Sequence, residues 1–156
     1  MLFRSPNTQD YSAFLGARAE IVPDLAAAIE RPVSKILGVG DEGRIAAAYR
    51  EAQERFAGRA AATVSHPRFL EILAPGATKA RGVAWLARRA GVPLAEVMAI
   101  GDQRNDLEML SVVGHGVAMP SAPDRVLEVA RYVAPPLEEE GAAQMIERLI
   151  LGGRPS

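Results

Sequence analysis

Apolar residues are spaced in two different ways along this chain, and the change falls close to Pro75 and Gly76. Before that point, short apolar runs bounded by Gly and Pro predict strands, and apolar residues that recur every three or four positions predict helices. The expected elements are a short helix after residue 12, a helix over 24–30, a strand over 33–40, a helix over 41–58, and strands over 60–67 and 68–75. Together they predict a small α+β lobe over residues 1–75.

The second part, residues 76–156, alternates regularly between short apolar strands and amphipathic helices. This alternation is typical of βαβ units on a parallel sheet, so we predict an α/β fold. The expected elements are a helix over 79–91, a strand over 96–101, a helix over 104–113, a strand over 116–119, a helix over 122–130, a strand over 131–134 and a helix over 140–151.

The same spacing predicts the surroundings of several side chains in the second part. Leu86 is expected to face inward, and Trp85 and Met109 to pack in the core. Ser121, followed three residues later by Asp124, predicts a capping box at the start of a helix. These expectations rest on local pattern alone.

The composition is that of an ordinary globular protein, with 49% hydrophobic and 24% charged residues. A net charge of −1 and a pI near 6.1 give no basic field, so neither nucleic acid nor a membrane is an expected partner. The absence of cysteines excludes thiolate catalysis and disulfides. No apolar run has the length of a signal-peptide core or a membrane span, so we expect a cytoplasmic location.

The stretch "VMAIGDQRNDLEML", residues 97–110, carries the strongest chemical signal. Asp102 ends an apolar strand, and Asn105 and Asp106 follow within one helical turn. Ligands bind outside the carboxyl ends of parallel strands, and a carboxylate there is a suitable oxygen ligand for Mg²⁺. One such aspartate could simply cap the helix, but two aspartates and an asparagine favour a site.

Lys79 is the second candidate, at the start of the preceding helix. Taken alone, it is best explained as a solvated surface lysine. Close to a strand end rich in carboxylates, it would instead neutralise a phosphoryl group and its transition state.

These segments together resemble a known family. "GDQRNDLEML", preceded by "TKARGVAWLARRAGV" and followed by "GHGVAMPSAPDRVLEVARYVAPPLEEEGAAQMIE", is similar to the C-terminal half of Cof-type phosphatases, subfamily IIB of the haloacid dehalogenase (HAD) superfamily. "SKILGVG" and "SHPRFLEILAPG" resemble the end of that subfamily's α+β cap. The resemblance covers residues 33–151. It implies a partial HAD-like (Rossmannoid) core with a parallel sheet over 76–156 and part of a cap over 1–75.

The resemblance also implies a role for each site residue. Asp102 would bind Mg²⁺, and Asn105 would contact the phosphate. Lys79 would hold the phosphoryl group and the nucleophile, and Asp106 would steady the metal site or the lysine. Ala80 departs from the family pattern, in which glycine usually follows this lysine; the change is small.

The turn "SHPRF" lies where a Cof-type cap faces its substrate. Ser65, His66 and Arg68 are therefore candidates for recognising the leaving group. An exposed turn between two strands explains the same residues equally well.

The nucleophile of this family, the first aspartate of an Asp-x-Asp motif, has no counterpart in the sequence. No two aspartates are two residues apart; they are Asp10, Asp24, Asp41, Asp102, Asp106 and Asp124. We therefore expect a portion of a Mg²⁺-dependent phosphatase of small phosphorylated metabolites, such as sugar phosphates, that works through an aspartyl-phosphate and is inactive alone. A truncated gene product, a wrong start codon and a proteolytic fragment all fit this expectation.

The missing motif leaves two other classes of protein to consider. A non-catalytic module that binds a phosphorylated ligand or a partner protein fits the sequence, whereas a receiver-like signalling domain would need an acidic pair on its first strand. Loss of the nucleophile strand would also expose the edge of the strand at 97–100. We expect that edge to pair with a second copy of the chain or with the N-terminal segment.

Overall fold

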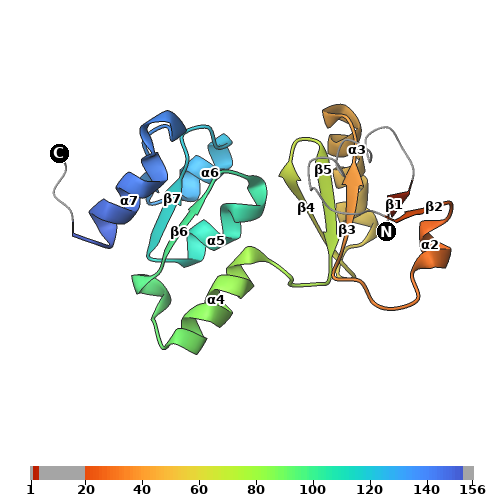
Figure 1. Ribbon diagram of the computed structural model, residues 1–156, viewed down its shortest axis with the longest axis horizontal. Helices are drawn as coiled ribbons and strands as arrows, with labels where there is room; N and C mark the ends of the chain where they lie inside the picture. Colours follow the sequence, from red (N-terminus) through yellow and green to blue (C-terminus); the bar gives the residue numbers. More distant parts are fainter. Residues whose placement is uncertain (1, 4–19, 153–156) are drawn as a thin grey trace. The chain divides into compact units, whose positions relative to one another are not determined.

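The computed structural model describes residues 2–3 and 20–152, and the chain divides into two compact units, Met1–Pro75 and Gly76–Ser156 (Figure 1). The short helix expected after residue 12 lies outside the described residues. No helix in the described ranges is both long enough and apolar enough to cross a bilayer.

Unit 1 is built on an antiparallel sheet in the order β3-β5-β4. Its elements are β1 (Leu2–Phe3), β2 (Ile21–Val22), α2 (Leu25–Ala28), β3 (Lys35–Val39), α3 (Glu42–Arg55), β4 (Ala61–His66) and β5 (Phe69–Leu73). The strands and helices expected over 24–75 are all present, with shorter bounds. β1 pairs with β2 in parallel, separately from the larger sheet.

The core of unit 1 lies between α3 and one face of this sheet. Ile45 and Ala52 from the helix pack with Leu70 and Ile72, which alternate with outward residues along β5. Asp41 is the N-cap of α3, where its Oδ1 accepts a hydrogen bond of 3.0 Å from the backbone of Arg44. Asp41 therefore caps the helix.

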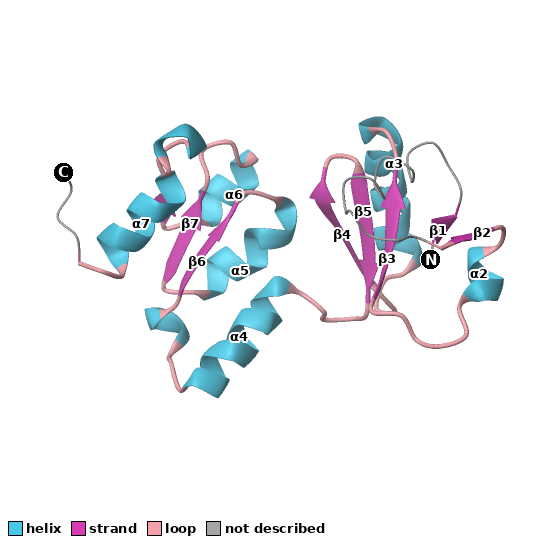
Figure 2. Cartoon of the chain, in the orientation of Figure 1, coloured by secondary structure: helices cyan, strands magenta, loops and turns pink. Residues whose placement is uncertain are grey.

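Unit 2 contains a parallel sheet in the order β6-β7-β8. Its strands β6 and β7 lie side by side in Figure 2. Its elements are α4 (Lys79–Ala90), η1 (Leu94–Glu96), β6 (Met98–Gly101), η2 (Arg104–Asp106), α5 (Leu107–Val112), β7 (His115–Ala118), α6 (Asp124–Val129), β8 (Tyr132–Val133), η3 (Leu137–Glu139) and α7 (Gly141–Leu149). The predicted βαβ alternation is confirmed. The helix expected over 104–113 is divided into a 3-10 turn and a short α-helix.

Helices cover both faces of the parallel sheet. Ala99 and Ala118 pack with Leu110 of α5 and Val126 of α6 in one core cluster. A second cluster joins Met145 of α7 to Val117 and Ala134, with Met98 and Ile100 against it. The sheet is therefore the middle of three layers, as in parallel sheets generally.

Two expectations about side-chain burial turn out differently, and one holds. Trp85 is 53% exposed and Leu86 is exposed as well, because α4 buries Ala87 instead. The guanidinium of Arg89 lies 5.6 Å from the centre of the Trp85 ring. Met109 is buried, as predicted.

The capping box expected at Ser121 is also absent. Pro123 is the N-cap of α6, which has no hydrogen bond from a capping side chain. The helix begins three residues after Ser121, at Asp124, so the serine is too early in the chain to act as its cap.

Leu110→Ala should destabilise unit 2 by about 2–5 kcal/mol, since it leaves a cavity at a fully buried position. Trp85 is the single tryptophan and belongs to this unit, so its fluorescence in a denaturant titration measures the change. Leu137→Ala, at an exposed position, is the matched control. Equal stability of the two variants would contradict the assignment of this core.

Candidate functional site

The candidate site lies where β6 ends and η2 begins. Gly101 is the last residue of β6, and its carbonyl accepts a hydrogen bond of 3.0 Å from the backbone of Met119 beyond β7. The strand therefore stays in register up to its carboxyl end. Asp102 follows at once with an exposed side chain, and the chain then turns into η2 with Asn105 and Asp106.

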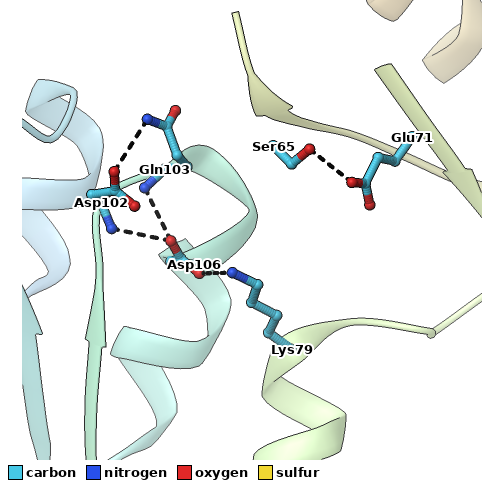
Figure 3. A network of polar contacts seen from close by, with 6 residues as sticks. All are labelled: Ser65, Glu71, Lys79, Asp102, Gln103 and Asp106. Carbon is cyan, nitrogen blue, oxygen red and sulfur yellow. Dashed lines mark hydrogen bonds and ion pairs between the residues drawn. The ribbon is translucent and has the colours of Figure 1, made fainter. Parts of the chain in front are cut away.

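Asp106 is the structural centre of the site, and only 2% of the residue is exposed. Its Oδ2 accepts hydrogen bonds from the backbone nitrogens of Asp102, at 3.1 Å, and Gln103, at 3.0 Å. Its Oδ1 accepts one from Lys79 Nζ, at 2.5 Å (Figure 3). One carboxylate therefore fixes both the loop after β6 and the start of α4.

Gly101 makes this position of Asp106 possible. A Cβ at residue 101 would lie 2.4 Å from Cβ of Asp106 and 2.6 Å from its Cγ. Both atoms are closer than any two non-bonded carbons can approach, so another residue here would push Asp106 away from the loop.

Lys79 belongs to the site and is not a free surface lysine. Its side chain is half exposed, and its ammonium group contacts Asp106. Thr78 is the N-cap of α4 and accepts a bond from the backbone of Arg81, which sets the start of the helix immediately before Lys79.

Two oxygen-bearing side chains near the loop have free bonding capacity. Asn105 Oδ1 is buried and has no hydrogen-bond partner among the described residues. Buried polar atoms are nearly always satisfied, so this oxygen is a candidate contact for a ligand or a water molecule. Asp102 Oδ2 accepts one hydrogen bond from a described side chain, Gln103 Nε2 at 3.4 Å, and remains available on its exposed side.

This donor set fits Mg²⁺. The ion prefers oxygen ligands and is commonly bound by one or two carboxylates together with water and a substrate phosphate. Asp102 provides a carboxylate and Asn105 an amide oxygen. The described residues contain no group of three acidic or histidine side chains suited to a metal, so most ligands would come from water and phosphate.

The three candidates of the β4–β5 turn belong to unit 1, and each has a local contact. Ser65 Oγ donates to Glu71 Oε1 at 2.7 Å. His66 Nδ1 accepts from the backbone of Arg68 at 3.2 Å, and Arg68 Nε donates to the carbonyl of Gly40 at 3.3 Å. The contact of His66 lies within the turn, that of Arg68 ties the turn to the residue after β3, and Ser65 points to a carboxylate.

Sequence reasoning missed Gln103 and Glu71. Gln103 stands inside the quoted motif, but nothing in the spacing shows that its amide reaches Asp102. Glu71 lies in an apolar strand, and its contacts with Lys35 and Ser65 depend on strand register. A lone acidic residue inside "FLEIL" was the available signal.

The haloacid dehalogenase-like hydrolase family matches residues 7–146, so the chain belongs to this family. The α/β fold is the HAD-like fold, as predicted. A haloacid dehalogenase-like hydrolase from Bacteroides thetaiotaomicron is 34% identical, with a TM-score of 0.75. A HAD subclass IIB sugar phosphatase is 26% identical, with a TM-score of 0.76.

The chain spans only part of these relatives. The alignments cover 94% of this chain and 55% of the Bacteroides structure, and 90% of this chain and 52% of the sugar phosphatase. The 5-amino-6-(5-phospho-D-ribitylamino)uracil phosphatase YwtE of Bacillus subtilis is 37% identical over 92 residues, which are 59% of this chain and 32% of YwtE.

Gly101→Ala should destabilise unit 2 by about 1–3 kcal/mol, because the added methyl group displaces Asp106 and leaves its buried bonds unmade. Gly82→Ala is the matched control: it lies within α4, where a Cβ meets nothing within 4 Å, and should stabilise the helix slightly. Thermal unfolding of both variants measures the difference. A Gly101→Ala variant as stable as the native chain would contradict the role given to Asp106.

Proposed function

We propose that this chain is the phosphate-binding and metal-binding portion of a Mg²⁺-dependent phosphatase that acts on small phosphorylated metabolites of the sugar-phosphate type. The observation that carries the proposal is the convergence of Lys79, Asp102, Asn105 and Asp106 at the carboxyl end of β6, with Asn105 Oδ1 buried and unpaired. Relatives named as sugar and ribityl phosphate phosphatases support the substrate class.

Each residue has a distinct part in this proposal. Lys79 neutralises the phosphoryl oxygens, and Asp106 holds its ammonium group in place. Asn105 donates from its amide nitrogen to a phosphate oxygen without adding negative charge, while its unpaired Oδ1 is available to the metal ion. Asp102 is the carboxylate ligand of Mg²⁺, an ion that supplies charge stabilisation to a bound phosphate.

The nucleophile is proposed to lie outside this chain. The sequence has no two aspartates separated by one residue, so an aspartyl-phosphate cannot form on an Asp-x-Asp motif here. The same observation favours a second candidate function, a non-catalytic module that binds a phosphorylated ligand.

Lys79→Met should weaken the binding of inorganic phosphate about tenfold or more, since a charge-assisted hydrogen bond is lost. Titration calorimetry with and without Mg²⁺ measures the affinity. Arg88→Met, an exposed substitution on the same helix, is the matched control. Asp102→Asn should remove the Mg²⁺-dependent gain only, and equal phosphate affinity in all variants would contradict the proposed site.

Hydrolysis of an aryl phosphate separates the two candidate functions. We expect no turnover by the chain alone, and turnover when an N-terminal segment of a relative with the Asp-x-Asp motif is added. Asp102→Asn should abolish that restored activity. Turnover by the chain alone would show that it holds a nucleophile, and phosphate binding that never leads to turnover would favour the non-catalytic module.

The edge of β6 is the proposed contact with the remainder of the enzyme or with a second copy of the chain. Within the described residues β6 pairs with β7 alone, and β1 pairs with β2. An apolar parallel strand with one unpaired edge is prone to add another strand.

We therefore expect slow hydrogen exchange at the outward backbone amides of Met98–Gly101 in the assembled protein, together with a molar mass above that of one chain in light scattering. The exposed loop over residues 30–34, between α2 and β3, offers an internal comparison of exposed amides. A monomer that exchanges the outward amides of β6 as fast as this loop would contradict the pairing.

A further inference from the structure

The side chain of Gln103 touches the carboxylate that is proposed as the metal ligand. Gln103 lies between the end of β6 and η2, and its Nε2 donates a hydrogen bond of 3.4 Å to Asp102 Oδ2 (Figure 3). The other oxygen of Asp102, Oδ1, accepts no hydrogen bond from residues 20–152. The contact with Gln103 therefore makes the two oxygens of this carboxylate unequal.

The backbone of Gln103 is fixed on both sides by Asp106. Its nitrogen donates to Asp106 Oδ2 at 3.0 Å, and its carbonyl accepts from the backbone nitrogen of Asp106 at 2.9 Å. Gln103 is also partly buried, whereas Asp102 is exposed. The Gln103 amide thus extends from a rigid point, and it restrains a carboxylate that would otherwise rotate about its own side-chain bonds.

The restraint affects how Asp102 can bind a cation. Binding through Oδ1 alone leaves the hydrogen bond from Gln103 intact. Binding through both oxygens has to compete with the Gln103 amide for Oδ2. Asp102 is therefore prepared to act as a ligand through one oxygen.

Mg²⁺ and Ca²⁺ use carboxylates in different ways. Mg²⁺ demands a nearly ideal octahedron and keeps several water ligands, so one carboxylate oxygen in a fixed position suits it. Ca²⁺ takes more oxygen ligands in a looser geometry and often binds a carboxylate through both oxygens. Because the described residues offer no group of three acidic or histidine side chains, Ca²⁺ would depend on both oxygens of Asp102.

We propose that Gln103 is a positioning residue that presents Asp102 through one oxygen and thereby favours Mg²⁺ over Ca²⁺. The proposal rests on the proposed function, in which Asp102 is the carboxylate ligand of the metal ion. Gln103 then takes part in the choice of ion without touching the ion itself.

The test is a pair of NMR titrations of the whole chain, one with Mg²⁺ and one with Ca²⁺, in which the amide signals of residues 101–106 report binding. Gln103→Leu keeps a side chain of similar size and removes the donor. It should weaken Mg²⁺ binding about tenfold, the lower end of the effect of removing a hydrogen bond from a metal ligand, because this bond is long and exposed. Ca²⁺ binding should stay the same or become tighter.

The ratio of the two affinities distinguishes positioning from a merely structural role. A general disturbance of the loop would weaken both ions equally and leave the ratio unchanged, which would overturn the proposal. Gln103→Glu also removes the donor but adds a carboxylate, so it should shift the preference further toward Ca²⁺ and tests the proposal even where Gln103→Leu perturbs the fold.

Gln53→Leu is the matched control. Gln53 is an exposed glutamine of α3 in unit 1, and its Nε2 also donates a side-chain hydrogen bond, to the Tyr49 hydroxyl at 2.7 Å. Its replacement should leave the affinities for both ions unchanged.

Asp102→Asn separates this proposal from the proposed function. It should abolish the Mg²⁺ shifts if Asp102 is the ligand. Mg²⁺ shifts that require Asp102, together with the same ion preference in the native chain and both Gln103 variants, would overturn the role of Gln103 alone. A native chain without saturable Mg²⁺ shifts, or with shifts that persist in Asp102→Asn, would refute both proposals.

Discussion

The buried carboxylate of Asp106 is the interaction on which the rest of the candidate site depends. Three donors reach it: two backbone nitrogens from the loop after β6 and the ammonium group of Lys79. A desolvated carboxylate is tolerable only when such donors surround it. The loop and the first turn of α4 are thus held against each other by one side chain, which leaves Asp102 and Asn105 free to face a ligand.

The two polar clusters are built by different means. In unit 2 the parts come from a strand end and a helix start, so short connections suffice to bring them together. In unit 1 the parts, Lys35, Ser65 and Glu71, come from three strands and meet only because the register of the sheet places them side by side. A shift of one residue in that register would turn Glu71 toward α3 and dismantle the cluster.

This difference explains how much could be predicted from the sequence. Two features are local in the chain and could therefore be predicted from the sequence. They are the βαβ alternation and the grouping of Asp102, Asn105 and Asp106. Glu71 was not found, because its partners are set by pairing between distant strands. The exposure of Trp85 was missed for a related reason: helical spacing defines a stripe, but the neighbouring elements decide which stripe is buried. The predicted capping box of α6 is absent because a proline stands at the start of that helix instead.

The division of the chain at Pro75 has a consequence for biosynthesis. Each unit is a continuous segment, and within unit 2 every sheet partner is the next strand along the chain. Contacts between near neighbours form quickly, because little loop entropy is lost in closing them. Because all of unit 1 precedes unit 2 in the chain, unit 1 can acquire its core during translation, while the residues of unit 2 are still being added. Unit 2 can then form its sheet from neighbouring strands.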